Sequence, residues 1–214
     1  MKKFSLLLVI LLISSTGCKK EDSRLSFSLK NLTTLLGKTS EYISSASPGE
    51  IYKDEDDYLY FFLEDIIDGI DEVYVYYKLD SYEECDYINI VLSYINSLSD
   101  ADTLLNLAEY EFGTAEYYYL SYYDDSSVLQ EYVYDTKSEL QTCKDTAGVS
   151  LNNIDQVFGL YHYDKYYILA GGYYSDTYNC FFSLIEIGFY NDLSKSGKGV
   201  LFNNIREPYR KWRK

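Results

Sequence analysis

The stretch Glu72-Val-Tyr-Val-Tyr-Tyr-Lys-Leu79 decides the fold, because side chains of two kinds alternate along it. Successive side chains of a β-strand point to opposite faces, so a period of two predicts a strand with one covered face. The expected core positions are Val73, Val75, Tyr77 and Leu79. Residues 58–64 and 87–95 also have strand character, and turn residues separate the three segments. The sequence therefore predicts a three-stranded antiparallel meander.

The remaining segments predict five more strands and three helices. Strands are expected at residues 116–123, 128–134, 157–163, 166–173 and 180–190. Helical spacing of apolar residues predicts helices at residues 29–46, 101–112 and 136–147. Gly37 can divide the first helix in two, and Asp100 is the expected N-cap of the second. Thr136 and Glu139 form a capping box at the start of the third, in which Leu140, Cys143 and Ala147 are expected to face inward.

This order of elements predicts an α+β fold of antiparallel β-meanders packed against three helices. Residues 29–194 are expected to form a single domain, with possible halves at 29–97 and 98–194. The segments Tyr76–Cys85 and Tyr173–Cys180 share the order Tyr-Tyr, Asp, Ser or Thr, Tyr, Cys. A duplicated helix-plus-meander unit would explain this echo. Coincidence in a chain so rich in tyrosine is the alternative.

Residues 1–17 have the pattern of a signal peptide that is removed from the mature protein. Lys2 and Lys3 precede a ten-residue apolar segment, residues 4–13, which is too short to span a bilayer. Ser15-Thr-Gly-Cys18 follows, and a charged tether occupies residues 18–28. The alternatives are a plain secretory signal and a retained membrane helix.

The segment ending at Cys18 resembles the lipobox of bacterial lipoproteins, although Ser15 stands where Leu is commoner. The resemblance implies acylation of the Cys18 thiol and attachment to a membrane through lipid chains. Lys19, in place of an Asp after the cysteine, implies a Gram-negative outer membrane. The helix-plus-meander pattern over residues 30–95 also resembles BLIP-like and SmpA/OmlA-like envelope domains. That resemblance is architectural and implies no functional residue.

Charge is divided unevenly along the chain. Residues 25–194 hold 31 acidic and 7 basic residues, a balance of 7 − 31 = −24, whereas residues 195–214 hold 7 basic and 1 acidic, or +6. Because phosphate binding depends on Lys and Arg, the acidic body excludes nucleic acid as a partner. The basic tail, residues 195–214, could contact anionic headgroups. The alternatives are a solvated tail and one folded back on the acidic body.

Tyrosine is the unusual component, with 27 residues among 214. Its ring has an apolar body and a polar tip, so tyrosines on a sheet can hold a glycan or a partner protein. The candidate binding residues are Tyr74, Tyr76, Tyr117, Tyr119, Tyr173 and Tyr174. Together with the anchor, they favour a non-catalytic binding module of the cell envelope.

The alternative function is a carboxylate-dependent, glycosidase-like envelope hydrolase. Glu186 is the candidate catalytic residue because it lies within an apolar strand, where burial would raise its pKa. An outward-facing glutamate on a half-exposed strand is the favoured interpretation of the same residue. His162 is the single histidine, and the scattered cysteines lack metal-ligand spacing, so the sequence predicts no metal and no cofactor.

Overall fold

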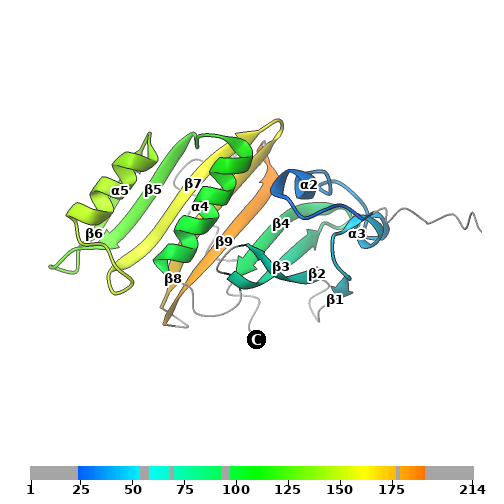
Figure 1. Ribbon diagram of the computed structural model, residues 1–214, viewed down its shortest axis with the longest axis horizontal. Helices are drawn as coiled ribbons and strands as arrows, with labels where there is room; N and C mark the ends of the chain where they lie inside the picture. The colour runs from blue at the N-terminus through cyan, green and yellow to red at the C-terminus, as the bar shows by residue number, and fades with distance from the viewer. Residues whose placement is uncertain (1–23, 54–57, 68–69, 93–96, 177–178, 191–214) are drawn as a thin grey trace, which may run out of the picture.

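The computed structural model describes residues 24–53, 58–67, 70–92, 97–176 and 179–190, which form one antiparallel nine-stranded sheet with four helices (Figure 1). The strands are β1 (Tyr52–Lys53), β2 (Leu59–Ile67), β3 (Ile70–Leu79), β4 (Cys85–Leu92), β5 (Tyr117–Tyr123), β6 (Leu129–Tyr134), β7 (Ile154–Tyr163), β8 (Tyr166–Ser175) and β9 (Cys180–Phe189). Their order across the sheet is β1-β2-β3-β4-β9-β8-β7-β5-β6. The predicted α+β class is confirmed.

The meander predicted around residues 72–79 is present as β2, β3 and β4. Val75 lies opposite Phe61 on one side and Ile90 on the other. The four expected core positions of β3 lie on the covered face, where Val73, Val75 and Tyr77 have no exposed surface and Leu79 is partly buried. The alternation in the sequence was therefore sufficient to assign both faces of this strand.

A second meander, β7–β8–β9, meets the first through the last strand of each. Asn89 of β4 lies opposite Glu186 of β9 in this antiparallel seam. The hairpin β5–β6 extends the sheet beyond β7. Five strands therefore belong to the second half and four to the first, in one continuous sheet.

The described residues contain four helices where the sequence predicted three. These are α2 (Leu29–Thr33), α3 (Ser40–Ala46), α4 (Leu98–Phe112) and α5 (Lys137–Thr146). The first predicted helix is divided, since α2 ends at Thr33 and Gly37, between α2 and α3, has a left-handed φ of 71° that a continuous helix would not allow. None of the helices in the described ranges is long and apolar enough to cross a membrane.

The start of α4 differs from the prediction and that of α5 agrees with it. Ser97 is the N-cap of α4, and Asp100 is the third helical residue, whose carboxylate accepts from the Ser97 amide at 2.6 Å. Asp100 therefore stabilises the first turn of α4, but the N-cap residue is Ser97. In α5, the Glu139 amide donates to the Thr136 hydroxyl at 3.2 Å, so the predicted capping box is confirmed.

All four helices contribute to one apolar core against the same face of the sheet. α4 contacts β7, β8 and β9, α5 contacts β5 and β6, and Figure 1 shows both helices on the same side of the sheet. Glu111 of α4 accepts hydrogen bonds from the amides of Leu29 and Lys30, both at 2.9 Å. These amides begin α2 and have no partner within their helix, so Glu111 joins the helices of the two halves.

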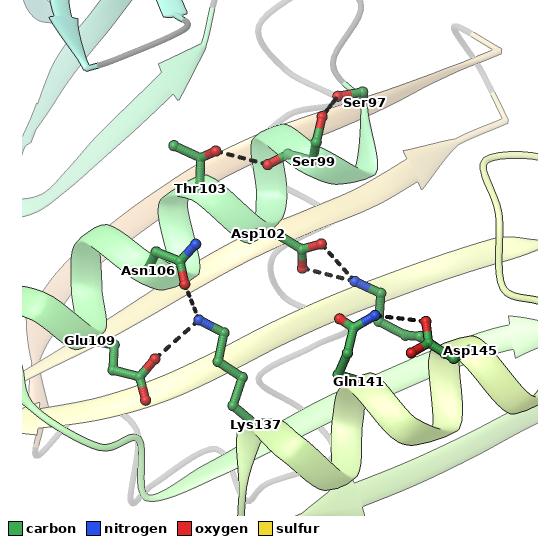
Figure 2. A network of polar contacts seen from close by, with 10 residues as sticks. Ser97, Ser99, Asp102, Thr103, Asn106, Glu109, Lys137, Gln141 and Asp145 are labelled. Atoms are coloured by element: carbon green, nitrogen blue, oxygen red, sulfur yellow. Dashed lines mark hydrogen bonds and ion pairs between the residues drawn. The ribbon is translucent and has the colours of Figure 1, made fainter.

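Two lysines of α5 reach across to α4 (Figure 2). Lys137 pairs with Glu109 at 3.0 Å and also contacts Asn106. Lys144 contacts both carboxylate oxygens of Asp102 at 2.8 Å, and its side chain is only 6% exposed. A lysine this buried needs such a partner, because an unpaired buried charge is costly.

The predicted inward face of α5 is confirmed, with different degrees of burial. Leu140 is buried, whereas Cys143 and Ala147 are half-buried against the core. No disulfide joins the three cysteines of the described ranges, Cys85, Cys143 and Cys180. Residues 1–17 and 195–214, and with them Cys18, lie outside the described residues, so the signal peptide, the acylation and the basic tail remain predictions.

Candidate functional site: the helix-free face of the sheet

The face of the sheet opposite the helices holds five of the six tyrosines that the sequence singled out. We call it the helix-free face. One cross-strand row runs over it from Tyr52 and Tyr60 through Tyr76, Asn89 and Glu186 to Leu169, Leu160 and Tyr117. The register thus aligns residues that are distant in the sequence. It also divides the face into an aromatic half and an apolar half.

The aromatic half is a ladder of five rings on β1, β2 and β3. We define this aromatic ladder as Tyr52, Tyr60, Phe62, Tyr74 and Tyr76. Neighbouring ring centroids lie 5.4 to 6.3 Å apart. Tyr52 and Phe62 are each 39% exposed and the other three rings are half-buried, so the ladder presents a row of ring surfaces. Cross-strand aromatic pairs of this kind also stabilise the sheet.

Carboxylates accept hydrogen bonds from two hydroxyls of the ladder. The Tyr52 hydroxyl donates to Glu50 at 3.2 Å, and the Tyr74 hydroxyl donates to Glu72 at 3.1 Å. The charge of Glu50 raises the pKa of Tyr52, so this phenol stays protonated at neutral pH. The ladder therefore combines apolar ring surfaces with fixed acceptors beside them.

The apolar half is a second hydrophobic cluster on β5, β7, β8 and β9. We define this second cluster by its buried members, Tyr117, Tyr119, Phe158, Leu160, Tyr167, Leu169, Tyr173 and Leu184. Three predicted binding residues, Tyr117, Tyr119 and Tyr173, belong to it, each less than 10% exposed. Burial raises the pKa of Tyr117 and of Tyr119 to about 12. These three tyrosines are packed, unlike those of the ladder.

The sixth predicted binding residue, Tyr174, lies on the other face. It packs against the helix-covered core, and its hydroxyl donates to Asn179 at 2.7 Å. Because Tyr173 and Tyr174 are adjacent in β8, they point to opposite faces. The prediction that both share a binding surface is therefore wrong for Tyr174.

Glu186 is buried on the helix-free face, at the seam between the two meanders. Its side chain accepts a hydrogen bond from the Tyr167 hydroxyl at 2.5 Å, and its residue is 9% exposed. Burial raises the pKa of Glu186, with Asp86 adding to this effect, while Tyr167 and Lys78 oppose it. The favoured interpretation, a half-exposed outward glutamate, is wrong. The side chain does point away from the helices, as this interpretation requires, but it is buried on that face.

Asn89 lies beside Glu186 in the same cross-strand row and is 1% exposed. Neither its amide nitrogen nor its carbonyl oxygen has a hydrogen-bond partner in the described part of the chain. A buried amide without partners is costly, so natural proteins rarely keep one. Asn89 and Glu186 thus place two buried polar side chains next to each other where β4 pairs with β9.

His162 has no nucleophile beside it in the contacts of the described residues. Its ring stacks on Tyr190, with centroids 4.2 Å apart, and its Nδ1 lies 3.7 Å from Glu116. These contacts are those of a surface histidine that helps to hold the end of β9. Within the described ranges, no group of three or more His, Cys, Asp or Glu side chains is placed to hold a metal ion.

An open cavity of about 470 Å³ lies away from this face, next to α3. Its lining includes Glu41, Lys53, Leu79 and Glu83. Because the lining lacks Glu186 and every ladder residue, the cavity contributes nothing to either predicted site.

The sequence missed three of the five ladder residues, Tyr52, Tyr60 and Phe62. The alternation of β2 could have indicated Tyr60 and Phe62, since Leu59, Phe61 and Leu63 face the core. Tyr52 carried no signal, because β1 has only two residues. Comparison with known proteins finds no matching family, no curated relative and no similar solved structure.

Proposed function

We propose that the protein is a non-catalytic binding module of the bacterial cell envelope, anchored by lipid at Cys18, whose aromatic ladder binds a glycan. The observation that carries this proposal is the row of five rings on β1, β2 and β3. Rings fixed on paired strands lose little conformational freedom on binding, which reduces the entropic cost.

The chemistry of the ladder favours a carbohydrate chain. A row of ring faces fits the apolar faces of successive sugar units, and Glu50 and Glu72 provide hydrogen-bond acceptors for hydroxyl groups. The net charge of residues 25–194 disfavours anionic ligands. A neutral polysaccharide is therefore the expected ligand, and a protein partner is the other outcome that the experiment can give.

The binding experiment compares two exposed aromatic sites on opposite faces. Phe62→Ala with Tyr74→Ala removes two ladder rings, and Tyr132→Ala is the matched control. Tyr132 is 40% exposed and stacks on Tyr122 and Tyr134, which lie on the helix-covered side.

On an array of neutral and charged glycans, we expect the wild type and Tyr132→Ala to bind alike and the ladder variant to lose at least tenfold in affinity. Removal of an aromatic ring that stacks on a nucleic-acid base costs about 1–3 kcal/mol, and we expect an effect of similar scale for a ring against a sugar face. No glycan bound by any of the three proteins, or equal loss in the control, would reject the ladder as a glycan site. Capture of one envelope protein by the ladder alone would instead indicate a protein ligand.

The proposed location is the outer membrane. Removal of residues 1–17 and acylation of Cys18 would hold the acidic domain beside that membrane through several chains, each strengthening attachment by about 0.8 kcal/mol per buried methylene. Labelled palmitate should enter the wild type and not Cys18→Ser. Fractionation should then find the wild type in the outer membrane and the variant in the soluble fraction.

A carboxylate-dependent hydrolase is the alternative that we propose second. Its support is the raised pKa of buried Glu186 beside Asp86. A glycosidase needs two carboxyl groups facing one substrate. Hydrolysis of a bound glycan that Glu186→Gln abolishes, without loss of binding, would favour this alternative over the binding module.

We also propose that the fold contains a duplicated helix-plus-meander unit. Its support is the position of the two echoing segments, each of which joins the second and third strands of a meander, β3 to β4 and β8 to β9. The second half has α5 and the β5–β6 hairpin in addition. Relatives in which each half stands alone would support the duplication.

A further inference from the structure

The second cluster is buried although the described helices lie on the opposite face. Leu169 and Leu184 have no exposed surface, and the eight buried members all belong to strands. Side chains in the middle of an uncovered sheet face would keep part of their surface in water, whereas sheets with both faces buried are covered on both sides. The second cluster therefore requires a covering segment that is neither α2, α3, α4 nor α5.

The described chain ends on this face. Tyr190 follows β9 directly, packs against the second cluster and stacks on His162. Its hydroxyl lies 3.4 Å from both oxygens of Glu116. The 214 − 190 = 24 residues that follow therefore start at the edge of the second cluster. At about 3.3 Å per extended residue, they can cross five strands spaced about 4.8 Å apart.

The charge of this face is complementary to that of the tail. Glu131 accepts from Tyr119 at 2.5 Å and Glu186 from Tyr167, and Glu116 lies beside Tyr190. Each of the three lysines in residues 117–190 contacts residues of the helix-covered side of the sheet. Lys137 and Lys144 pair with α4, and Lys165 lies over Tyr166 and Phe189, which pack in the helix-covered core. Carboxylates on the helix-free face thus outnumber cations in this half.

The sequence beyond Ser194 has both properties that such a face requires. It carries seven Lys or Arg residues against one acidic residue. Its apolar residues are Val200, Leu201, Phe202, Ile205, Tyr209 and Trp212. A segment with only one of these properties would satisfy either the carboxylates or the apolar cluster, but not both.

We propose that residues 195–214 dock on the second cluster and form the outer layer of β5, β7, β8 and β9. The apolar residues of the tail cover Leu169 and Leu184, and its cations lie near Glu116 and Glu131. The helix-free face is then closed by the protein's own tail in one half and left to the ladder in the other. This inference does not depend on the ladder binding a glycan.

Trp212 is the only tryptophan of the chain and reports on the docking directly. The full-length protein in neutral detergent is compared with a peptide of residues 195–214 in the same detergent. We expect blue-shifted Trp212 emission and a several-fold lower acrylamide quenching constant in the protein. Glu116→Lys with Glu131→Lys should raise the quenching constant towards that of the peptide. Glu41→Lys with Glu83→Lys, the same charge change at exposed residues elsewhere, should not.

A second measurement locates the tail without changing the charges. A photo-crosslinking residue at Phe182, which packs against the second cluster, should capture a tail peptide, and the same residue at Tyr132 should not. Quenching equal to that of the peptide, or protection that persists in Glu116→Lys with Glu131→Lys, would overturn the proposal. So would protection that appears only with phosphatidylglycerol vesicles, which would assign the tail to anionic headgroups.

Discussion

The two meanders use the same sheet in different ways. In β3, buried positions alternate with half-buried ones, whereas the first eight residues of β7 and of β8 are all buried. The difference shows that the alternation of side chains along a strand predicts which face of the sheet each one lies on, but does not predict whether that face is exposed to solvent. Exposure depends on what covers that face, and cover comes from elsewhere in the chain.

The strands of the second meander show the difference in their sequences. Cys180–Phe189 and Tyr166–Ser175 are nearly continuous apolar runs, which is typical of strands buried on both faces. Glu72–Leu79 instead places Glu and Lys among the tyrosines of one face. The following predictions test whether the two meanders differ in energy as they differ in burial.

The largest effect is expected at Gly171, where β7 and β8 approach each other closely. A Cβ there would lie 2.0 Å from the backbone oxygen of Val157, and φ is 151°. Gly171→Ala should lower the free energy of unfolding by about 3 kcal/mol or more, through overpacking and backbone strain together.

Gly148→Ala is the matched control, because Gly148 has a φ of 61° and no atom within 4 Å of its Cβ position. Gly148→Ala should lower the free energy of unfolding by only about 1 kcal/mol. Urea denaturation measures both. Equal losses in the two variants would contradict a close contact between β7 and β8.

The next effect compares the two faces of β9 at adjacent residues. Leu184 belongs to the second cluster and Ile185 to the helix-covered core, and neither has any exposed surface. Leu184→Ala and Ile185→Ala should each lower the free energy of unfolding by about 2–5 kcal/mol, the range for buried large-to-small changes. A loss at Leu184 below about 1 kcal/mol would show that its face is not a core.

The third prediction concerns the pH dependence that Glu186 adds. Because burial raises the pKa of Glu186 in the folded state, the folded protein keeps this proton to higher pH than the unfolded chain does. The contribution to stability is complete below the unfolded pKa, near 4.5, and is lost as the pH rises through the folded pKa.

Glu186→Gln cannot titrate, so it should lack this dependence. The urea midpoint of the wild type should fall relative to that of Glu186→Gln as the pH rises above the unfolded pKa, near 4.5. Glu64→Gln, at an exposed glutamate of β2, is the control and should leave the pH profile of the wild type unchanged. Parallel profiles for the wild type and Glu186→Gln would show that the carboxyl is not buried.

The smallest effect is expected in the ladder. Phe62 is 39% exposed and contacts Tyr52 and Tyr74. Phe62→Ala should lower the free energy of unfolding by about 1 kcal/mol, which is the contribution expected from one cross-strand pair. Phe158→Ala, the equivalent change at a residue 1% exposed in the second cluster, should cost about 3–5 kcal/mol. Similar thermal or urea midpoints for these two variants would remove the distinction between the halves.

Much of the fold could be predicted from local sequence. Alternation and turn residues located all strands except the two-residue β1, and capping chemistry located the start of α5. The start of α4 was misplaced because Ser97 and Asp100 both have cap chemistry, and the Ser97 amide, which donates to the Asp100 carboxylate, lies at the N-cap.

The candidate site could be predicted less well, because it depends on strand order. The pairing of β4 with β9 places Asn89 beside Glu186, and no local pattern indicates it. Tyr174 was assigned to the wrong face although its adjacency to Tyr173 carried the information. Lys144 was missed because its burial depends on the carboxylate of Asp102, from another helix.

The seam between β4 and β9 also has a consequence for the order of folding. Its partners, such as Asn89 and Glu186, are among the most distant in the chain to be joined by backbone pairing. Contacts of such separation form slowly, because loop closure costs entropy before any contact compensates for it. We expect the edge of β4 to stay unpaired until the last strand, β9, has been synthesised and is free to pair. Until then, this edge can pair with strands of other unfolded chains, so aggregation during folding is expected to begin there.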